Sequence, residues 1–389
     1  MYSNEATDMV SVQTEETKQE GQYMKQSHIY TSGHHHTALD GLFRYAEFLK
    51  FGELHVRFDP ETGLRAIVAI HNLNRGPAIG GCRLISYPSS DAALEDAIRL
   101  GYMMSYKAAI SGLPHGGAKA VIMRPKVIQN RKALLEAFAR FIHDLDGRYI
   151  TAVDSGTTLH DMDIIHTITP YVTSLTMAAG VSNDPSPWTA HGVRRGIEAA
   201  VRFRLKRESL DGIHVAIQGV GHVGYLLAKE LHESGATLTV CDVDPKSTER
   251  CVEEFGATVV SPEDIYDVSA DVFAPCALGS IVNLETVDRL RVSIVAGSAN
   301  NQLAHQRYGQ LLKERDILYA PDFVINAGGL IFVAAIYDHS DAKRAVEHVD
   351  KIDLILTEIF ERAASENQST SLVAEQIARE KLNEKTMKI

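Results

Sequence analysis

The second half of the chain alternates short apolar runs with amphipathic stretches. Apolar runs occur at 213–219, 237–242, 271–275, 293–297 and 316–320, and helical patterns follow the first two, ending near His232 and Phe255. Strands that are each separated by a helix are typical of a parallel sheet with helices on both faces. The pattern therefore predicts a doubly wound α/β domain from about residue 213 onward.

The first half mixes both periodicities. Apolar positions such as Leu94 and Ile98 recur at three- and four-residue steps over 90–106, after the helix-start residues Ser90 and Asp91. Further helices are predicted at 41–52, 131–145, 161–169, 186–205 and beyond 345, strands at 119–123 and 147–153, and a hairpin over 55–72 around DPETG. The glycine-rich stretch 74–83, NRGPAIGGCR, reads as a loop.

Composition narrows the class of protein. A chain of 389 residues with 45% hydrophobic and 23% charged residues is typical of a globular protein and favours two domains. The net charge of −11 argues against binding a nucleic-acid backbone. Four cysteines without paired spacing predict a reduced, cytoplasmic setting and no structural zinc.

The N-terminal residues 1–37 carry few apolar side chains and no periodicity, which predicts a disordered extension. Its polar, acidic character differs from that of a signal peptide. The run His34–His36 could bind a metal ion, but an incidental run in a flexible tail is the alternative that we favour. We therefore expect no metal site.

Two lysines bracket a glycine-rich stretch, MMSYKAAISGLPHGGAK, at 103–119. Lys107 lies near the end of a predicted helix and Lys119 at the start of a predicted strand. A buried lysine can hold a carboxylate as an ammonium group, or act as a base if burial and a neighbouring cation lower its pKa. Two solvated surface lysines are the alternative. His115 could also be a base, but Lys119 is better placed at its strand.

The sequence VAIQGVGHVG places Gly219, Gly221 and Gly224 after an apolar strand and at the start of a helix. This spacing suits a pyrophosphate bound at a helix N-terminus. Asp242 ends the next predicted strand, where a carboxylate would accept from a ribose 2′-hydroxyl and repel a 2′-phosphate. The pattern favours NAD over NADP; an empty domain of the same fold is the alternative.

Two further sites carry polar groups at predicted strand ends, and a third carries apolar residues after a glycine pair. Asp154 follows the strand at 147–153, where it could relay protons, pair with a lysine or only cap a loop. Asn300 and Asn301 follow the strand at 293–297, where their amides could bind a ligand or cap a helix. Leu330 and Val333 could line a pocket or fill a core.

Taken together, eight motifs in this order resemble the Glu/Leu/Phe/Val amino-acid dehydrogenase family, in particular its leucine, valine and phenylalanine branch. The resemblance covers about 42–385 and rests on GPAIGGCR, MSYKAAISGLPHGGAK, TAVDSGTTLHDMDIIH, NDPSPWTAHGV, QGVGHVG, APCALG, AGSANNQL and APDFVINAGG. It implies two domains with a cleft between them: an α/β substrate and oligomerisation domain with a mixed sheet (38–173 plus 346–389), and a Rossmann-type NAD-binding domain (174–345).

The resemblance implies NAD-dependent oxidative deamination of an L-amino acid to the 2-oxo acid, ammonium and NADH. Lys119 is then the general base, Asp154 takes part in proton transfer, and Lys107 binds the substrate carboxylate. Gly81, Met104 and Asn301 help to bind substrate. The residues implied for NAD are Gly219, Val220, Gly221, Gly224 and Asp242 on the adenosine side, and Thr189, Asn300, Cys276 and Ala277 on the nicotinamide side.

The family's specificity positions match Ile79, Ala152, Leu330 and Val333, all of them apolar. A substrate carboxylate buried against isoleucine would lack a partner, which disfavours glutamate. Leucine is the substrate that we favour, with valine and isoleucine accepted. A phenylalanine or valine dehydrogenase is the alternative, because one methylene changes specificity only modestly.

Two other classes of function are weaker. A non-catalytic NAD-binding regulator would not need Lys107, Lys119 and Asp154 together. A 2-hydroxy acid dehydrogenase relies on a histidine with a carboxylate and an arginine, which the two-lysine stretch does not supply. The resemblance also implies a homo-oligomer, from dimer to octamer. His115 departs from the family pattern, which affects the expected pH optimum and not the reaction.

Overall fold

The computed structural model describes residues 46–47, 49–178, 180–339 and 341–383. The chain divides into two compact units, Met1–Phe51 and Gly52–Ile389, and the second carries the strands and helices of the site. The predicted extension 1–37, with His34–His36, and residues 41–45 and 48 of the predicted helix at 41–52 lie outside the described residues. Of the rest of that predicted helix, residues 46–47 are helical and residues 49–52 are not.

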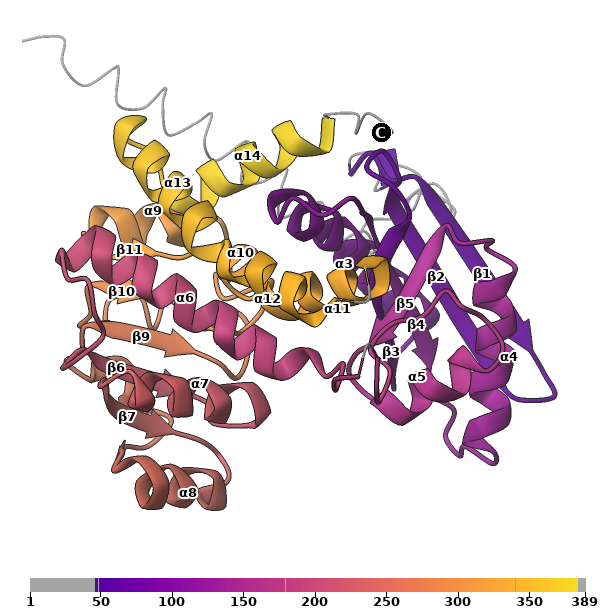
Figure 1. The fold of residues 1–389 in the computed structure, drawn as a ribbon, viewed down its shortest axis with the longest axis horizontal. Helices are drawn as coiled ribbons and strands as arrows, with labels where there is room; N and C mark the ends of the chain where they lie inside the picture. The colour runs from indigo at the N-terminus through magenta and orange to yellow at the C-terminus, as the bar shows by residue number, and fades with distance from the viewer. Residues whose placement is uncertain (1–45, 48, 179, 340, 384–389) are drawn as a thin grey trace, which may run out of the picture. The chain divides into compact units, whose positions relative to one another are not determined.

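The N-terminal part of the second unit contains five strands among the described residues: β1 (Glu53–Asp59), β2 (Leu64–Asn72), β3 (Ala78–Ile85), β4 (Gly116–Met123) and β5 (Tyr149–Val153). They form one sheet in the order β1-β2-β4-β3-β5 (Figure 1). β1, β2 and β4 pair antiparallel, whereas β3 is parallel to both β4 and β5. This arrangement confirms the predicted hairpin and mixed sheet.

Three helices accompany this sheet: α3 (Ser90–Ile110), α4 (Arg131–His143) and α5 (Leu159–His166). The Ser89 side chain accepts from the Ala92 N–H and caps α3 one residue before the predicted start. Gly112 has φ +71 just past the end of α3, a conformation that glycine adopts readily. Apolar side chains of α4 and α5 share one buried cluster with the sheet.

The prediction of a loop at 74–83 is wrong over its second half, because Ala78–Ile85 is the strand β3 between β4 and β5. A Cβ atom at Gly80 would collide with the carbonyl oxygen of Ala118 on β4. Glycine density here reflects the close approach of two strands, which the sequence pattern cannot distinguish from a turn.

The glycine turn predicted between Lys107 and Lys119 is also shorter than expected. Gly116 and Gly117 are the first residues of β4, so Lys119 is the fourth residue of its strand and not the first. A Cβ atom at Gly117 would collide with the backbone of Ser105 on α3. These glycines therefore let helix α3 pack directly on β4, and Gly112 alone of the three glycines lies in the turn.

The C-terminal part contains six parallel strands among the described residues: β6 (His214–Gln218), β7 (Thr237–Cys241), β8 (Thr258–Val259), β9 (Val272–Pro275), β10 (Ile294–Val295) and β11 (Leu318–Tyr319). Their order is β11-β10-β9-β6-β7-β8, with β6 at the centre. This is the doubly wound order of dinucleotide-binding domains, as predicted. The connecting elements are α7 (His222–Glu233), α8 (Pro245–Phe255), the 3₁₀ turn Asp264–Asp267 and α9 (Arg307–Glu314).

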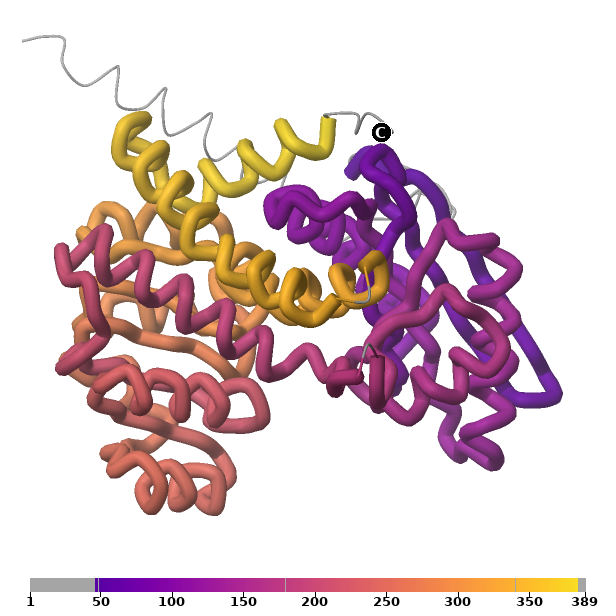
Figure 2. The backbone as a smooth tube through the Cα atoms, in the orientation of Figure 1, coloured from indigo at the N-terminus to yellow at the C-terminus, as the bar shows by residue number. Residues whose placement is uncertain are grey.

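A long helix, α6 (Pro185–Leu205), follows α5 after residues 167–184, as the tube in Figure 2 shows. Asp184 caps α6 and Pro185 begins it, one residue before the start of the helix predicted at 186–205. The last helices are α10 (Asp322–Ile325), α11 (Gly328–His339), α12 (Ala342–Asp350), α13 (Ile352–Ser365) and α14 (Thr370–Asn383). α6 packs against α7, α11 and α13.

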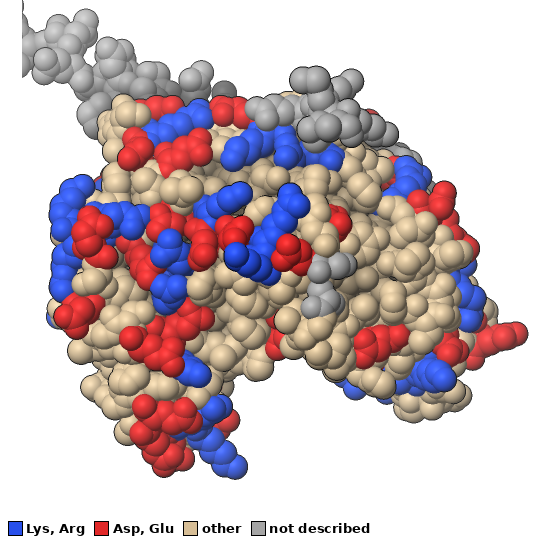
Figure 3. Space-filling model, viewed as in Figure 1, with Lys and Arg blue, Asp and Glu red and all other residues tan. Residues whose placement is uncertain are grey.

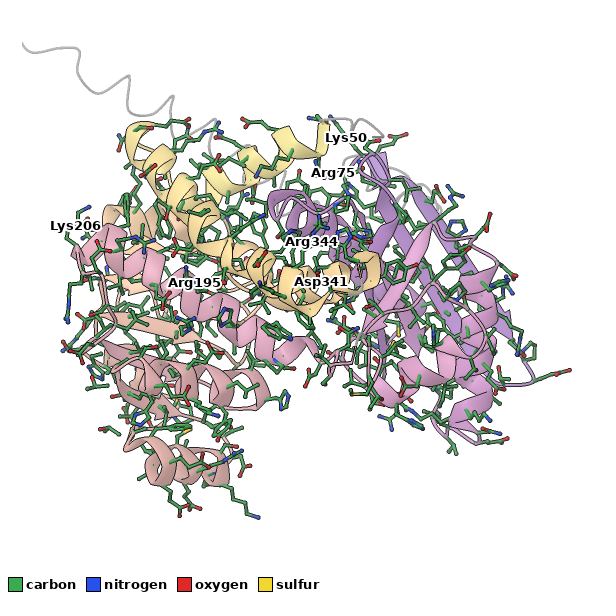
Figure 4. All side chains as sticks on the ribbon, viewed as in Figure 1. Lys50, Arg75, Arg195, Lys206, Asp341 and Arg344 are labelled. Carbon is green, nitrogen blue, oxygen red and sulfur yellow. The ribbon has the colours of Figure 1, made fainter. Side chains whose placement is uncertain are left out.

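Charged contacts reinforce this helical layer. Arg195 of α6, labelled in Figure 4, donates to Asp353 of α13 at 3.1 Å. The buried residues of α13 and α14 share one apolar cluster with β6 and β9 and with Tyr106 and Ile110 of α3. The final helices thus contact both parts of the unit, and the predicted division at 173/174 and 345/346 stays a prediction.

The surface carries charged side chains of both signs (Figure 3). On the face drawn in Figure 3, acidic and basic side chains are interspersed. Among the described residues, no helix is long and apolar enough to cross a membrane. In the same residues, no group of three histidine, cysteine, aspartate or glutamate side chains could hold a metal ion.

Candidate active site

Lys119 and Asp154 form an ion pair between the middle of β4 and the end of β5. Lys119 points from β4 and is 6% exposed, and Asp154 follows the last residue of β5. β3 separates the two strands in the sheet, and Gly81 of β3 lies beside Asp154. A Cβ atom at Gly81 would come within 2.8 Å of the Asp154 Cβ, so glycine at this position leaves room for the carboxylate.

The turn after β5 fixes the Asp154 side chain. The Asp154 N–H donates to Thr157 Oγ1 at 2.9 Å, and the Thr157 hydroxyl lies 3.1 Å from the Cys82 carbonyl oxygen. The Ser155 N–H donates to Asp154 Oδ1 at 2.5 Å. Asp154 therefore caps its own loop and also pairs with Lys119, and its part in proton transfer stays a prediction.

Arg83 on β3 is a cation near Lys119, and its charge lowers the pKa of that lysine. Its Nε lies 3.6 Å from Asp154 Oδ1, and its Nη1 donates to Asp96 of α3 at 2.8 Å. Burial lowers the pKa of Lys119 to about 7, and the Arg83 charge contributes in the same direction. Asp96 opposes this pKa shift as an anion, whereas Lys107 adds to it. A lysine with this pKa is half neutral near pH 7 and can act as a base.

Lys107 lies in the last turn of α3 and has a different acidic neighbour. Burial lowers its pKa to about 8, and the Asp322 carboxylate opposes that change. Asp322 begins α10, and its Oδ2 accepts from the Gln302 N–H at 2.8 Å. Asn301, beside Gln302, has φ +51, so Asp322 holds the segment that places Asn301 in a left-handed conformation.

The residues predicted for the substrate side chain come from three elements. Ile79 of β3 is fully buried, and Leu330 of α11 packs against the same apolar cluster. Ala152 of β5 pairs in register with Gly81, beside Asp154. Val333 of α11 is buried in the larger cluster of the parallel-sheet region. Met104 lies on α3 where that helix meets Gly117 of β4, and its side chain is partly buried.

The glycine turn after β6 fits a dinucleotide. Gly219 has φ +89, and a Cβ atom there would lie 2.6 Å from the Ala277 Cβ. A Cβ atom at Gly224 would collide with the Gly219 carbonyl oxygen and lie 3.3 Å from the Cys276 Cβ. At Gly221, by contrast, a Cβ atom would meet nothing within 4 Å. The second glycine thus borders open space at the start of α7, where a pyrophosphate binds in such folds.

Asp242 lies next to this turn, one residue past β7. Its Oδ2 accepts from the Val220 N–H at 2.8 Å, and its Oδ1 accepts from the Asp244 N–H at 3.0 Å. These bonds hold an acceptor beside the glycine turn, the position from which a carboxylate accepts from a ribose hydroxyl. The residues present therefore fit NAD.

The remaining predicted nicotinamide-side residues lie on other elements. The Thr189 hydroxyl donates to the Pro185 carbonyl of its own helix at 2.9 Å and lies beside Gly329 at the start of α11. The Asn300 side-chain oxygen accepts from Asn326 at 2.8 Å, and Asn300 is exposed. Among the described residues, neither the Thr189 nor the Asn300 side chain forms a hydrogen bond with the glycine turn after β6.

Comparison with known proteins decides the family. A sequence model of the "Glu/Leu/Phe/Val dehydrogenase, dimerisation domain" matches residues 51–171, and the "Glutamate/Leucine/Phenylalanine/Valine dehydrogenase" model matches residues 243–384. The chain belongs to this family. It is an amino-acid dehydrogenase, and NAD is the cofactor of its family. The predicted resemblance is thereby confirmed.

Individual relatives of this dehydrogenase differ in the amino acid they are named for. The chain is 48% identical to a leucine dehydrogenase of Thermoactinomyces intermedius over 88% of this chain and 93% of that protein. It is 40% identical to a phenylalanine dehydrogenase of Caldalkalibacillus thermarum over 84% and 90%. The crystal structure of L-tryptophan dehydrogenase from Nostoc punctiforme superposes with a TM-score of 0.77 at 41% identity, covering 88% and 98%.

Sequence reasoning missed three groups in this dehydrogenase. Arg83 ends the motif GPAIGGCR, but the sequence assigned it no role, although a neighbouring cation helps Lys119 to act as a base. Asp322 was not assigned, because its partners Lys107 and Gln302 are distant from it in the sequence. His115 was considered as a base, whereas its ring nitrogens face the Pro77 carbonyl and Asp338. No spacing rule in the sequence pairs these residues.

Proposed function

We propose that this amino-acid dehydrogenase oxidises a branched-chain L-amino acid, with leucine favoured and valine and isoleucine accepted. The products are the 2-oxo acid, ammonium and NADH. The observation that carries the chemistry is the buried pair of Lys119 and Asp154 beside Arg83, because it supplies a base of suitable pKa next to a fixed proton acceptor. The leucine preference is supported by the apolar residues Ile79, Ala152, Leu330 and Val333 and by the leucine dehydrogenase relatives.

Each charged residue then has a separate task. The Lys107 ammonium holds the substrate carboxylate, which fixes the amino acid by its backbone end. Asp154 accepts a proton from the substrate amine. NAD, when bound, accepts the hydride that leaves the substrate Cα. Neutral Lys119 takes a proton from the water that attacks the resulting imine carbon, and the carbinolamine then releases ammonia and leaves the 2-oxo acid.

The cofactor is held, in this proposal, by the turn Gly219–Gly224, with Asp242 accepting from the adenosine ribose. On the nicotinamide side, the cofactor would be held by Thr189, Asn300, Cys276 and Ala277. Asn301 and Gly81 orient the substrate beside Lys119 and Asp154, and Met104 contacts it from α3. Exclusion of water around the reacting atoms would strengthen every one of these charged interactions.

Assembly into a homo-oligomer is part of the same proposal. β1 is the end strand of the mixed sheet, and its Val56 and Phe58 are 53% and 66% exposed. An exposed edge strand with apolar side chains is suited to pairing with another chain. Size-exclusion chromatography with light scattering measures the assembly, and a protein that stays monomeric at micromolar concentration contradicts this part.

A panel of substrates tests the proposed reaction. Steady-state formation of NADH is measured with L-leucine, L-valine, L-isoleucine, L-phenylalanine, L-tryptophan and L-glutamate at equal enzyme concentration. We expect the highest kcat/KM for leucine, followed by valine and isoleucine, and no turnover of glutamate. A higher kcat/KM for phenylalanine or tryptophan would contradict the branched-chain preference, and activity on glutamate alone would contradict the apolar pocket.

A further inference from the structure

The position of helix α11 decides how wide the proposed side-chain pocket is. Leu330 and Val333 lie on α11, whereas Ile79 and Ala152 lie on strands of the mixed sheet. These four residues can line one pocket only while α11 keeps a fixed place beside β3 and β5. Contacts that hold α11 against the mixed sheet therefore influence which side chains the enzyme admits.

Most of those contacts are apolar. Ala334 of α11 is buried with Ile79, Ala108, Leu113 and Ile150, and Leu330 and Tyr337 pack on the same cluster. Apolar contacts are not directional and tolerate sliding of one surface over the other. In the middle of α11, the Thr173 hydroxyl donates a hydrogen bond to the Val333 carbonyl oxygen at 3.1 Å. This hydrogen bond is directional, so it limits sliding of α11 at that point.

The last turn of α11 is held by His115 and Asp338. The His115 Nε2 lies 3.1 Å from Asp338 Oδ1 and 3.0 Å from Oδ2, and its Nδ1 lies 3.1 Å from the Pro77 carbonyl oxygen. The His115 side chain is 3% exposed. Pro77 directly precedes β3, the strand of Ile79, so one imidazole connects α11 to the start of that strand.

Two acceptors surround the His115 ring: the Pro77 carbonyl oxygen faces Nδ1 and the Asp338 carboxylate faces Nε2. A ring nitrogen that carries a hydrogen donates to the acceptor that it faces. Hydrogen bonds have a narrow range of favourable geometries, unlike the apolar packing around them.

We propose that His115 and Asp338 form a specificity-determining positioning pair, which holds α11 at a fixed distance from β3 and thereby excludes side chains larger than those of the branched-chain amino acids. The inference rests on the proposed function, because it refines the substrate range of the same site. Neither residue is placed in contact with substrate or cofactor. Both act through Leu330, Val333 and Ile79.

The variants Asp338→Ala and His115→Leu test the pair. In each, kcat and KM are measured for leucine, valine and phenylalanine, and the Kd of NADH is measured by fluorescence. We expect the ratio of kcat/KM for leucine over phenylalanine to fall about tenfold, the size of effect that pocket dimensions have on related substrates. The change should come mainly from the KM values, with kcat for leucine and the Kd of NADH within about threefold of the unaltered enzyme.

Conservative variants and a neighbouring control separate positioning from general loosening. In Asp338→Asn, the amide can donate to Nε2 while Nδ1–H still donates to Pro77, so most of the selectivity should return. Asp341, labelled in Figure 4, caps α12 by accepting from the Arg344 N–H at 3.1 Å. Asp341→Ala removes the cap of α12, just after α11, and leaves His115 and Asp338 unaltered. In this variant the ratio of kcat/KM for leucine over phenylalanine should stay unchanged.

The outcomes distinguish this inference from the proposed function. If both variants fold, by thermal melting, and the ratio is unchanged, or if kcat/KM falls by the same factor for every substrate, the pair has no role in specificity. If Asp338→Ala does not fold, Asp338→Glu replaces it: its extra methylene should change the ratio at least about threefold, and an unchanged ratio overturns the inference. If the unaltered enzyme turns over none of these amino acids, the proposed function itself fails.

Discussion

The two lysines of the candidate site have neighbours from different parts of the chain. Lys119, Asp154 and Arg83 come from adjacent strands of one sheet, all within residues 78–154. Lys107 faces Asp322, which belongs to a helix more than 200 residues later and also holds the Gln302 backbone. Burial lowers the pKa of both lysines, to about 7 and about 8. The difference lies in the neighbours: Lys119 has the Arg83 cation nearby as well as its ion-pair partner Asp154, whereas Lys107 has the Asp322 carboxylate.

This contrast suggests separate tasks for similar side chains. A cation beside Lys119 favours its neutral form, which a base needs, whereas an anion beside Lys107 favours the ammonium, which a carboxylate anchor needs. In the free enzyme, kcat/KM should rise as Lys119 loses its proton near pH 7 and fall as Lys107 loses its proton near pH 8. Separate substitutions test whether the two lysines have different tasks. They are made at Lys119, Lys107, Arg83 and Asp322.

The largest effect is expected from Lys119→Ala. Loss of the base should reduce kcat roughly 10²- to 10⁴-fold, the range of general acid–base catalysis, and leave the Kd of NADH nearly unchanged. Steady-state kinetics and NADH fluorescence measure the two quantities. Lys126→Ala, at an exposed lysine beyond the end of β4, is the matched control and should retain full activity. Near-normal turnover by Lys119→Ala would assign the base to another group.

Lys107→Gln should act on substrate binding. A charge-assisted hydrogen bond contributes about 1.5–3 kcal/mol, so its loss should raise KM for leucine about 10- to 100-fold and lower kcat less. The comparison with Lys119→Ala is the sharpest test, because the two variants should differ in which parameter changes. Lys351→Gln is an exposed control. A fall in kcat at unchanged KM would mean that Lys107 does not anchor the carboxylate.

Arg83→Met should move the acidic limb of the pH profile. Since Arg83 lowers the pKa of Lys119, its removal raises that pKa, and the limb of kcat/KM near pH 7 should shift upward by about one pH unit. The profile is measured for leucine between pH 6 and 10. Arg124→Met, at an exposed arginine after β4, should leave it in place. An unchanged or lowered limb would show that Arg83 does not influence the base.

The smallest effect is expected from Asp322→Asn. The amide oxygen can still accept from the Gln302 N–H, but the negative charge that opposes the lowered pKa of Lys107 is lost. The alkaline limb of kcat/KM should therefore shift downward, by roughly 0.5 pH unit, with little change in kcat at pH 7. Asp288→Asn, at an exposed position, is the control. An upward shift would be inconsistent with a charge effect on Lys107.

Much of the fold was predictable from the sequence because the patterns are local. The parallel strands with their helices, the helix predicted at 186–205 and the strand before Asp154 all follow from periodicity within about ten residues. The prediction failed at Ala78–Ile85, where glycine density was interpreted as a loop. Those glycines lie inside a strand because the backbones of β3 and β4 approach too closely for a side chain.

The family motifs identified the candidate residues, but their partners could not be predicted in the same way. Arg83 on β3 and Asp96 on α3 are 13 residues apart in sequence, and their side chains form a hydrogen bond between the strand and the helix. His115 and Asp338, whose side chains are also in contact, are 223 residues apart. No periodicity relates residues so far apart. Their side chains meet because the sheet order places β3 between β4 and β5 and because α11 returns to the mixed sheet.

The sequence by itself therefore determined the class of this enzyme, its proposed cofactor turn and the lysines proposed to carry its chemistry, since each motif consists of residues close together along the chain. Only the tertiary structure decided which charges surround each lysine and what holds helix α11 beside the proposed pocket. Burial and Coulomb interactions depend on distance in space, and the fold alone sets those distances.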